Sequence, residues 1–355
     1  MSNSQICAGF VIRRMTQYYN LVYTFVMDNY TYKDLQFRFA GKSGLRIPIV
    51  SLGLWNNFSA GDDYNNIKKM LHTAFDLGIT HFNLANNYGP PPGSAETNFG
   101  KVLSDGLGTH RDQIIVASKA GFGMWEGPYG DGGSRKYLIA SIDQSLKRTG
   151  LNYFDIFYHH RPDYDTPMEE IALTLDRIVR DGKALYVGVS NYNGEQLAKM
   201  YVILSALKTP FIINQLAYSI AYREIEKNGA KDTAKKLGLG KIVFSPLAQG
   251  LLTDRYLNGI PKDSRAGKKL WGMGDRVTPE TIAKVKELDK IAKNRNQTLA
   301  QMALSWVLKD DAITSVLIGA SNPEQIKQNI QINTTFTKNE LDLIDKVGIN
   351  LLQIC

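Results

Sequence analysis

The sequence lacks the glycine-rich fingerprint of an open dinucleotide-binding sheet, because the turn after its first buried strand reads SLGLWNNF. It also has no GxxxxGK[ST] segment, which argues against phosphate binding by a P-loop. Cysteine is scarce: only Cys7 and Cys355 occur among 355 residues, and both lie in terminal segments. We therefore expect no structural disulfide and a reducing, cytoplasmic setting.

Charge of one sign is not concentrated in any segment. The chain has 42 Lys and Arg against 34 Asp and Glu, a formal net charge of +8, and the basic residues are scattered rather than interleaved with aromatics in a block. This distribution argues against a nucleic-acid partner. It suits a phosphorylated small ligand at least as well.

The sequence also lacks a hydrophobic run of membrane-spanning length. The uncharged stretch from Met15 to Met27 is too short for a membrane helix and is interrupted by Tyr, Gln and Asn. We expect residues 1–30 to form a poorly ordered extension and residues 31–355 to form the folded domain, with no membrane partner.

What the sequence does contain is a repeated alternation of strand-like and helical segments. A hairpin around GKSG is predicted to lead into a first barrel strand at Ile49 to Leu54. Seven further strand-like runs follow it, namely ITHFNLA, QIIVASKA, YFDIFYHH, ALYVGVS, FIINQLA, KIVFSPLA and TSVLIGA. Eight strands, each followed by a helix, are the pattern of a closed (β/α)8 TIM barrel.

The helical segments between these strands have recognisable faces and ends. The helix before ITHFNLA has one apolar face, formed by Ile67, Met70, Leu71, Ala74 and Phe75.

A later helix, in DTPMEEIALTLDRIV, has a start signal, in which Thr166 is predicted as the cap, Pro167 as the first helical residue and Glu169 at the capping-box position. Between strands seven and eight, QGLLTDRYLNGIPKDSRAGKKLWGMGD is predicted to be a long loop ahead of two helices. Loops of this length are usually functional or disordered.

Polar or titratable side chains occur at the ends of three successive strands. Asn83 and Tyr88 follow the second strand, Lys119 ends the third, and His159 and His160 end the fourth. Because the active site of such a barrel is built at the carboxyl ends of its strands, these side chains are expected to converge. A Lys119 cation would lower the pKa of Tyr88 from about 10, and His160 would donate to the oxygen that Tyr88 protonates.

Several ordered motifs then resemble the aldo-keto reductase family from about Tyr32 to the end. The segments GITHFNLANNYG, IIVASKAG and DIFYHHRPD resemble its catalytic motifs, and GVSNYN, NQLAYS, SPLAQGLLT and VLIGASNPEQIKQN resemble its cofactor segments. The resemblance implies that Tyr88 is the general acid, that Lys119 tunes its pKa and that His160 orients the carbonyl. It implies reduction of small aldehydes, of the glyceraldehyde 3-phosphate or methylglyoxal type, without a metal.

The resemblance further implies that NADPH lies extended over the barrel mouth. The helix opened by GASNPEQIKQN suits a 2′-phosphate, which favours NADPH over NADH. The substrate is expected to contact Trp55, Tyr88, His160 and Arg135. The expected cofactor contacts are Leu54, Trp55, Ser190, Asn191, Gln215, Ser245, Pro246, Leu247, Gly250, Arg255, Arg265, Gly319, Ser321, Gln325 and Asn329.

Two of these assignments leave an alternative open. Arg255 and Arg265 would clamp phosphates with two guanidinium groups, or they belong to an ordinary solvated loop. The basic GGSRKY segment would present Arg135 or Lys136 to a substrate phosphate, or it serves only to cap and solvate a helix.

One residue departs from the family's pattern. The family has an aspartate five positions before the catalytic tyrosine, and this chain has Asn83. Lys119 would be mostly neutral near neutral pH only if its pKa fell by more than about 3 units from about 10.4, which requires about 4–5 kcal/mol. Loss of one counterion at an effective dielectric near 20 is worth on the order of 4 kcal/mol before solvent relaxation reduces it, so we expect Lys119 to remain charged. The hypothesis is a working but slower reductase with a shifted pH profile.

The alternative is an NADPH-binding regulatory protein with little or no turnover, like the potassium-channel beta subunits of the same family. Assembly into a homo-oligomer, a tetramer or larger, is compatible with either reading.

Overall fold

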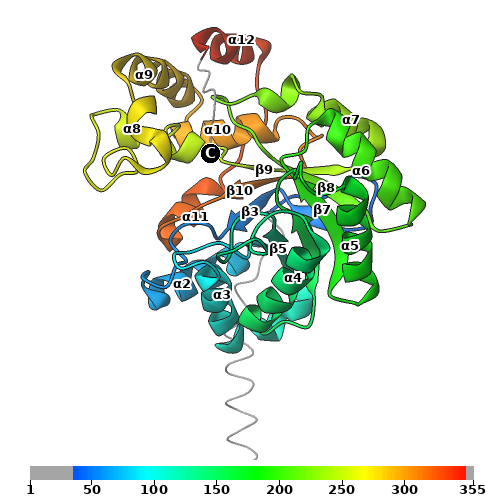
Figure 1. Ribbon diagram of the computed structural model, residues 1–355. Coiled ribbons are helices and arrows are strands. Elements are labelled where there is room, and N and C mark those ends of the chain that lie inside the picture. Colours follow the sequence, from blue (N-terminus) through cyan, green and yellow to red (C-terminus); the bar gives the residue numbers. More distant parts are fainter. Residues whose placement is uncertain (1–34, 349–355) are drawn as a thin grey trace, which may run out of the picture.

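Residues 35–348 are described by the computed structural model in Figure 1. Eight parallel strands close into a barrel, because the last strand, β10, pairs with both β9 and the first barrel strand, β3. The barrel strands are β3 (Val50–Gly53), β4 (His81–Asn83), β5 (Ile115–Ala120), β6 (Phe154–His159), β7 (Ala184–Ser190), β8 (Phe211–Ala217), β9 (Gly240–Phe244) and β10 (Ser315–Ile318). The TIM-barrel prediction is therefore confirmed, whereas the extension predicted over 1–30 lies outside the described residues.

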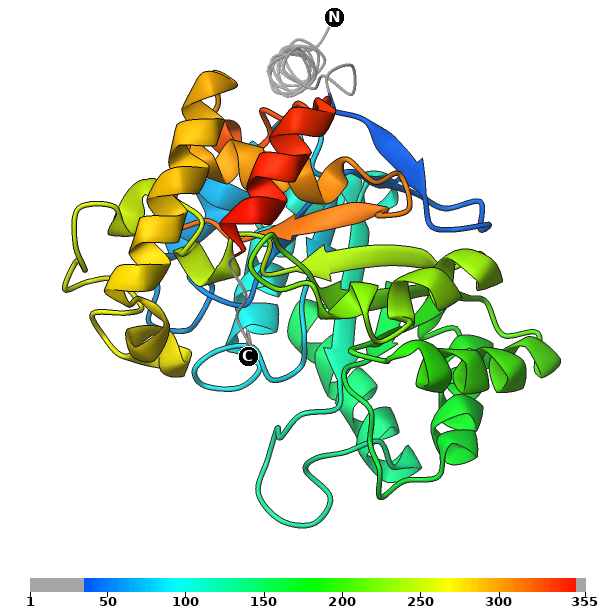
Figure 2. The ribbon, with the colours of Figure 1, turned by 90° about the horizontal axis from the view of Figure 1, so that it is seen from above.

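Helices surround this barrel, and α9 and α12 lie side by side outside α10 (Figures 1 and 2). None of the helices within residues 35–348 is both long and apolar enough to cross a membrane. The principal helices are α2 (Tyr64–Asp76), α3 (Ser94–Ser104), α4 (Arg135–Thr149), α5 (Met168–Arg180), α6 (Gly194–Ala206), α7 (Ala230–Leu237), α9 (Pro279–Asn294), α10 (Leu299–Leu308), α11 (Pro323–Asn329) and α12 (Lys338–Val347).

The predicted hairpin is formed by β1 (Phe37–Phe39) and β2 (Arg46–Pro48). The guanidinium group of Arg38 donates to the backbone oxygens of Leu308, Asp310 and Ile313, which lie just before β10. The hairpin therefore covers the end of the barrel where the strands begin. The opposite end, where the strands finish, remains available for a site.

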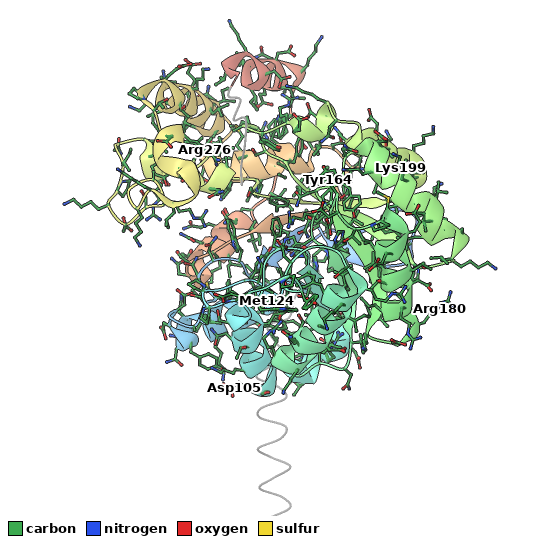
Figure 3. The ribbon with its side chains drawn as sticks, in the orientation of Figure 1. Asp105, Met124, Tyr164, Arg180, Lys199 and Arg276 are labelled. Carbon is green, nitrogen blue, oxygen red and sulfur yellow. The ribbon has the colours of Figure 1, made fainter. Side chains whose placement is uncertain are left out.

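Helices such as α2 and α5 bury an apolar face against the barrel and expose a polar one, whereas α10 is buried along almost its whole length. The five residues predicted to form the apolar face of α2 are the ones that are buried, which confirms the helical spacing of its apolar residues. On the outer faces, Arg180 of α5 and Lys199 of α6 point away from the barrel and are largely exposed (Figure 3).

The start of α5 differs from the prediction. The helix begins at Met168, and Pro167 occupies the cap position with extended backbone angles and no side-chain cap bond. Thr166 was expected to cap the helix, but its hydroxyl donates to Asp163 at 2.7 Å instead. The carboxylate of Asp163, which also accepts from the backbone N–H groups of Gly133 and Asp165, therefore contacts Thr166 one residue before the cap position.

The long loop predicted between the seventh and eighth barrel strands is confirmed, although it contains short helical turns. These are η3 (Ala248–Gly250), η4 (Asp254–Tyr256), η5 (Leu270–Gly272) and α8 (Met273–Arg276). The two helices predicted to follow it are α9 and α10. Elsewhere, short 3-10 turns are η1 (Leu107–Gln113) and η2 (Glu224–Glu226).

Close packing of α3 against the end of α4 yields a stability prediction. A Cβ at Gly100 of α3 would lie 2.5 Å from the backbone oxygen of Arg148 and 2.9 Å from Thr149 Cα. Because these are backbone atoms, Gly100→Ala should lower the free energy of unfolding by about 1–3 kcal/mol, despite the better helix propensity of alanine. Urea unfolding measures this change.

The matched control is Gly274→Ala in α8, where the nearest atom would be Lys269 Cγ at an ordinary 3.6 Å. This variant should lie within about 0.5 kcal/mol of the native protein. Equal stabilities for the two variants would show that α3 and α4 are not packed this closely.

Candidate active site

Three of the four predicted catalytic side chains meet at the end of β5. Lys119 is fully buried, and its Nζ donates to Asn83 Oδ1 at 2.6 Å and to the Tyr88 hydroxyl at 3.3 Å. It also donates to the backbone oxygen of Leu84. Lys119 Nζ therefore has three acceptors, one for each donor of its protonated form, and the Leu84 carbonyl is a partner that the sequence motifs did not reveal.

These side chains converge because their strands are neighbours. Asn83 ends β4, Lys119 is the penultimate residue of β5, and β4 pairs with β5 in parallel. Tyr88 is half-buried in the turn after β4, and its ring lies 4.9 Å from Lys119 Nζ. The convergence predicted for Asn83, Tyr88 and Lys119 is confirmed.

The electrostatics of Lys119 reflect burial without a contacting carboxylate. Desolvation lowers its pKa well below the usual 10.5, and the carboxylate of Glu96 opposes this change. Asn83 contributes only a neutral amide oxygen, and its Nδ2 is buried without a hydrogen-bond partner. The direction matches the expected effect of losing a counterion, while the charged state of Lys119 stays a prediction.

His160 is the second side chain that faces Tyr88. Their ring centroids lie 6.0 Å apart in an edge arrangement, and Phe122 lies 4.7 Å from His160 on another side. Burial, with help from the Lys119 charge, lowers the pKa of His160 well below 6.5, so its imidazole is neutral at neutral pH. The neighbouring His159 bonds instead to the Tyr192 hydroxyl at 2.7 Å, away from Tyr88.

The ends of β7 and β8 carry the next group of predicted residues. Asn191 has left-handed backbone angles, with φ 64°, and its Nδ2 donates to the His160 backbone oxygen at 3.1 Å. Ser190 and Gln215 are buried beside it, and the Asn191 N–H donates to the Gln215 backbone oxygen. Gln215 Nε2 is buried without a hydrogen-bond partner, so this amide fits a ligand carboxamide at the mouth.

The loop after β9 begins with an unusual backbone. Ser245, Ala248 and Gln249 all have positive φ, between 45° and 59°, which is uncommon for residues with a Cβ. Gly250 follows with φ 96°, and a Cβ there would meet no atom within 4 Å. The backbone borders open space at Gly250, as close approach of a pyrophosphate requires, and Pro246 and Leu247 belong to the same loop.

Two predicted arginines lie farther along the same loop. Arg255 Nη2 is 2.8 Å from the Asp263 carboxylate, and both side chains are largely exposed. Arg265 lies two residues beyond Asp263 and also takes part in an interaction of its own. Their role as a phosphate clamp stays a prediction.

The last group of predicted cofactor residues follows β10. Gly319 is exposed, with open space where a Cβ would be. The backbone N–H and hydroxyl of Ser321 both donate to Gln325 Oε1, and Asn322 caps α11. Asn329 at the end of α11 is buried. The exposed Gly319 and Ser321 therefore lie just after the carboxyl end of β10, at the mouth of the barrel.

Three remaining predictions concern the first strand and the loop before α4. Leu54 is buried, and its N–H donates to the Asn83 backbone oxygen, while Trp55 beside it is half-buried. Arg135 is exposed at the first position of α4, where its N–H donates to Glu170. Among the described contacts of Arg135, none reaches Tyr88, Lys119 or His160, so its proposed substrate contact stays a prediction.

Two residues that matter at this site were missed by the motifs. The Phe122 ring contacts His160 and is 37% exposed. Glu96 is a fully buried carboxylate that raises the pKa of Lys119. Phe122 follows the lysine motif directly, which is a signal that the sequence contained. Glu96 gave no such signal, because an acidic residue in the first turn of a helix is commonly solvated.

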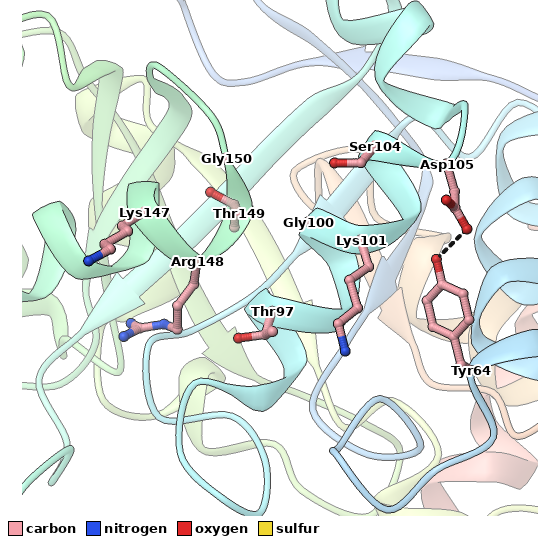
Figure 4. Close-up of a pocket in the computed structure, with 10 residues that line it drawn as sticks. All are labelled: Tyr64, Thr97, Gly100, Lys101, Ser104, Asp105, Lys147, Arg148, Thr149 and Gly150. Carbon is pink, nitrogen blue, oxygen red and sulfur yellow. Dashed lines mark hydrogen bonds between the residues drawn. The ribbon is translucent and has the colours of Figure 1, made fainter.

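A separate hollow of about 540 Å³ lies outside the barrel, between α3 and the end of α4 (Figure 4). It contains Lys101, Arg148 and the Tyr64 hydroxyl, which donates to Asp105. The last turns of α3 and α4 border it, and carbonyl groups at helix ends disfavour an anion. None of the predicted site residues lines it.

The fold and this arrangement of side chains agree with comparisons to known proteins. The chain belongs to the Aldo/keto reductase family, whose model matches residues 50–349, and it is therefore an oxidoreductase. It is 53% identical over 321 residues to the L-glyceraldehyde 3-phosphate reductase of Escherichia coli (strain K12), covering 89% of this chain and 93% of that protein. It is 34% identical over 323 residues, with the same coverage, to a putative voltage-gated potassium channel subunit beta of Schizosaccharomyces pombe.

The buried histidines predict how stability depends on pH. Burial lowers the pKa of His159 to about 4 and that of His81 to about 3, from 6.5. The unfolded chain therefore takes up protons below about pH 6.5 that the folded chain refuses, so stability is lost as the pH falls through this window. His159→Gln should flatten the dependence between about pH 4 and 6.5, by up to about 1.4 kcal/mol per pH unit.

The measurement is urea unfolding of the native protein and His159→Gln at several pH values. Parallel curves for the two proteins would contradict the depressed pKa of His159.

Proposed function

We propose that this protein reduces small aldehydes to alcohols with NADPH, and that its substrates are of the glyceraldehyde 3-phosphate or methylglyoxal type. The observation that carries the proposal is the Lys119 Nζ contact with the Tyr88 hydroxyl, at 3.3 Å, beside the neutral His160. The 53% identity to an L-glyceraldehyde 3-phosphate reductase supports this substrate class.

In the proposed mechanism, Tyr88 is the general acid. Bound NADPH supplies the hydride that the carbonyl carbon accepts. The Tyr88 hydroxyl gives its proton to the carbonyl oxygen, and the Lys119 ammonium stabilises the tyrosinate that remains. The neutral imidazole of His160 donates a hydrogen bond to the same oxygen and thereby orients the carbonyl.

The cofactor would be held by the residues that follow β7 to β10. Gln215 and Asn191 suit the carboxamide, because the buried Gln215 Nε2 has no protein partner. The Ser245 to Gly250 loop suits the pyrophosphate, because its backbone borders open space at Gly250. Ser321 and Gln325 would lie at the adenosine end. NADPH should bind more tightly than NADH because the amino terminus of α11, beside Ser321, suits the 2′-phosphate that NADPH alone carries.

Tyr88→Phe tests the acid. We expect this variant to lose about 100-fold or more in kcat, because general acid catalysis contributes that much, while its Kd for NADPH stays within about two-fold of the native value. NADPH absorbance, followed with methylglyoxal and with glyceraldehyde 3-phosphate, measures turnover. NADPH fluorescence measures binding.

Tyr64→Phe is the matched control, since its hydroxyl bonds to Asp105 outside the barrel. It should retain native turnover. Native-like turnover by Tyr88→Phe would remove Tyr88 from the chemistry and overturn the mechanism.

Asn83→Asp tests the missing carboxylate. An added negative charge 2.6 Å from Lys119 Nζ should hold that group as an ammonium ion, so kcat should rise and the alkaline limb of its pH profile should move to higher pH. Asn65→Asp adds the same charge on an exposed turn of α2 and should change neither quantity.

The outcome also separates the two candidate roles. A native protein that binds NADPH without turnover, while Asn83→Asp turns over, would favour a regulatory subunit over an enzyme. If the native chain is clearly active and Asn83→Asp is no faster, then the Asn83 amide does not lower kcat.

A further inference from the structure

A buried carboxylate lies behind the strand that carries Lys119. Glu96 belongs to the first turn of α3, and its side chain is fully buried. Its Oε1 accepts from the Ser118 hydroxyl at 2.6 Å, and its Oε2 accepts from Arg148 Nε at 2.7 Å. Because side chains alternate along a strand, Ser118 faces α3 while Lys119 faces the barrel interior.

On its own side of the strand, Lys119 meets no carboxylate among the described residues. Its three hydrogen-bond acceptors are the Asn83 amide, the Leu84 carbonyl and the Tyr88 hydroxyl, all of them neutral groups.

The other titratable groups around Lys119 do not supply a negative charge either. The histidines His81 and His160 are buried and neutral, and the Lys119 charge itself helps to keep their pKa values low. The Tyr158 hydroxyl, on the neighbouring strand, is buried, and desolvation raises its pKa. Glu96 is the carboxylate that raises the pKa of Lys119 against the effect of burial.

The partner of Glu96 does not cancel this charge completely. The Arg148 side chain is 18% exposed, whereas that of Glu96 has no exposure. Arg148 lines the hollow shown in Figure 4, so solvent there screens its positive charge.

We propose that Glu96 is the buried counter-charge of Lys119, acting through the β5 strand, and that it is a positioning residue which keeps the Tyr88–Lys119 pair in its proton-donating form. The proposal rests on the reductase function proposed above. It explains how a chain with Asn83 keeps a charged lysine next to its tyrosine.

Glu96→Gln tests the proposal through the pH profile of kcat. Removal of a negative charge lowers the pKa of both members of a coupled Lys–Tyr pair, so the direction does not depend on which one titrates first. We expect the alkaline limb to move to lower pH by about half a unit or more, with KM within about two-fold of the native value. Glu195→Gln, which removes the exposed Glu195–Lys199 ion pair of α6, is the control and should leave the limb in place.

Two double variants separate charge from structure. Glu96→Gln with Asn83→Asp should return the limb to the native position or beyond, because the new carboxylate touches Lys119 directly. If Glu96 had only a structural role, a carboxylate at position 83, on the other side of β5, would not restore the position of the limb. Glu96→Gln with Arg148→Gln leaves no unpaired buried charge, and it should still move the limb to lower pH.

A second readout needs neither substrate nor cofactor. Ultraviolet difference titration of the native protein against Tyr88→Phe isolates the tyrosinate of Tyr88, and the same difference in the Glu96→Gln background should titrate at lower pH. If the native chain has no turnover but this titration moves, the reductase proposal fails and the counter-charge stands. If kcat profiles and titrations coincide with and without the Glu96 carboxylate, the counter-charge proposal is overturned.

Discussion

Burial of the Lys119 ammonium group is the constraint on which the site depends. A lysine with no exposed surface must have every donor satisfied, and Asn83, Leu84 and Tyr88 provide the three acceptors. This requirement holds the Tyr88 hydroxyl beside the ammonium group and lines up β4 with β5. It also makes the local charge decisive, because a low-dielectric site transmits the field of a single carboxylate over a longer range than water does.

The outer layer of the barrel therefore contributes to the chemistry as well as to the packing. Contact between α3 and α4 is close enough that Gly100 has no room for a Cβ, and this contact brings Arg148 to the buried Glu96. Glu96 in turn bonds to the residue before Lys119. A change in helix packing would thus reach the lysine through one strand, without touching the mouth of the barrel.

Much of the fold followed from local patterns in the chain. All eight barrel strands, the hairpin and the long loop were predictable, because period and turn residues are local properties. The start of α5 was not, because the helix begins one residue later than the local rule predicts, and Thr166 contacts the loop residue Asp163 instead of capping the helix. The different surroundings of the two adjacent histidines also needed the structure, which places the His159 ring against Tyr192 and the His160 ring against Tyr88.

The sequence by itself determined the order of strands and helices, the Tyr88, Lys119 and His160 set, and the absence of a carboxylate at Asn83. These are properties of residue type and spacing, and they can be read along the chain. The tertiary structure decided which groups surround Lys119: the Leu84 carbonyl, the ring of Phe122 near His160, and Glu96 behind the strand. Such groups are set by how helices pack on strands, and no local pattern encodes the distance between a charge on α3 and an ammonium group inside the barrel.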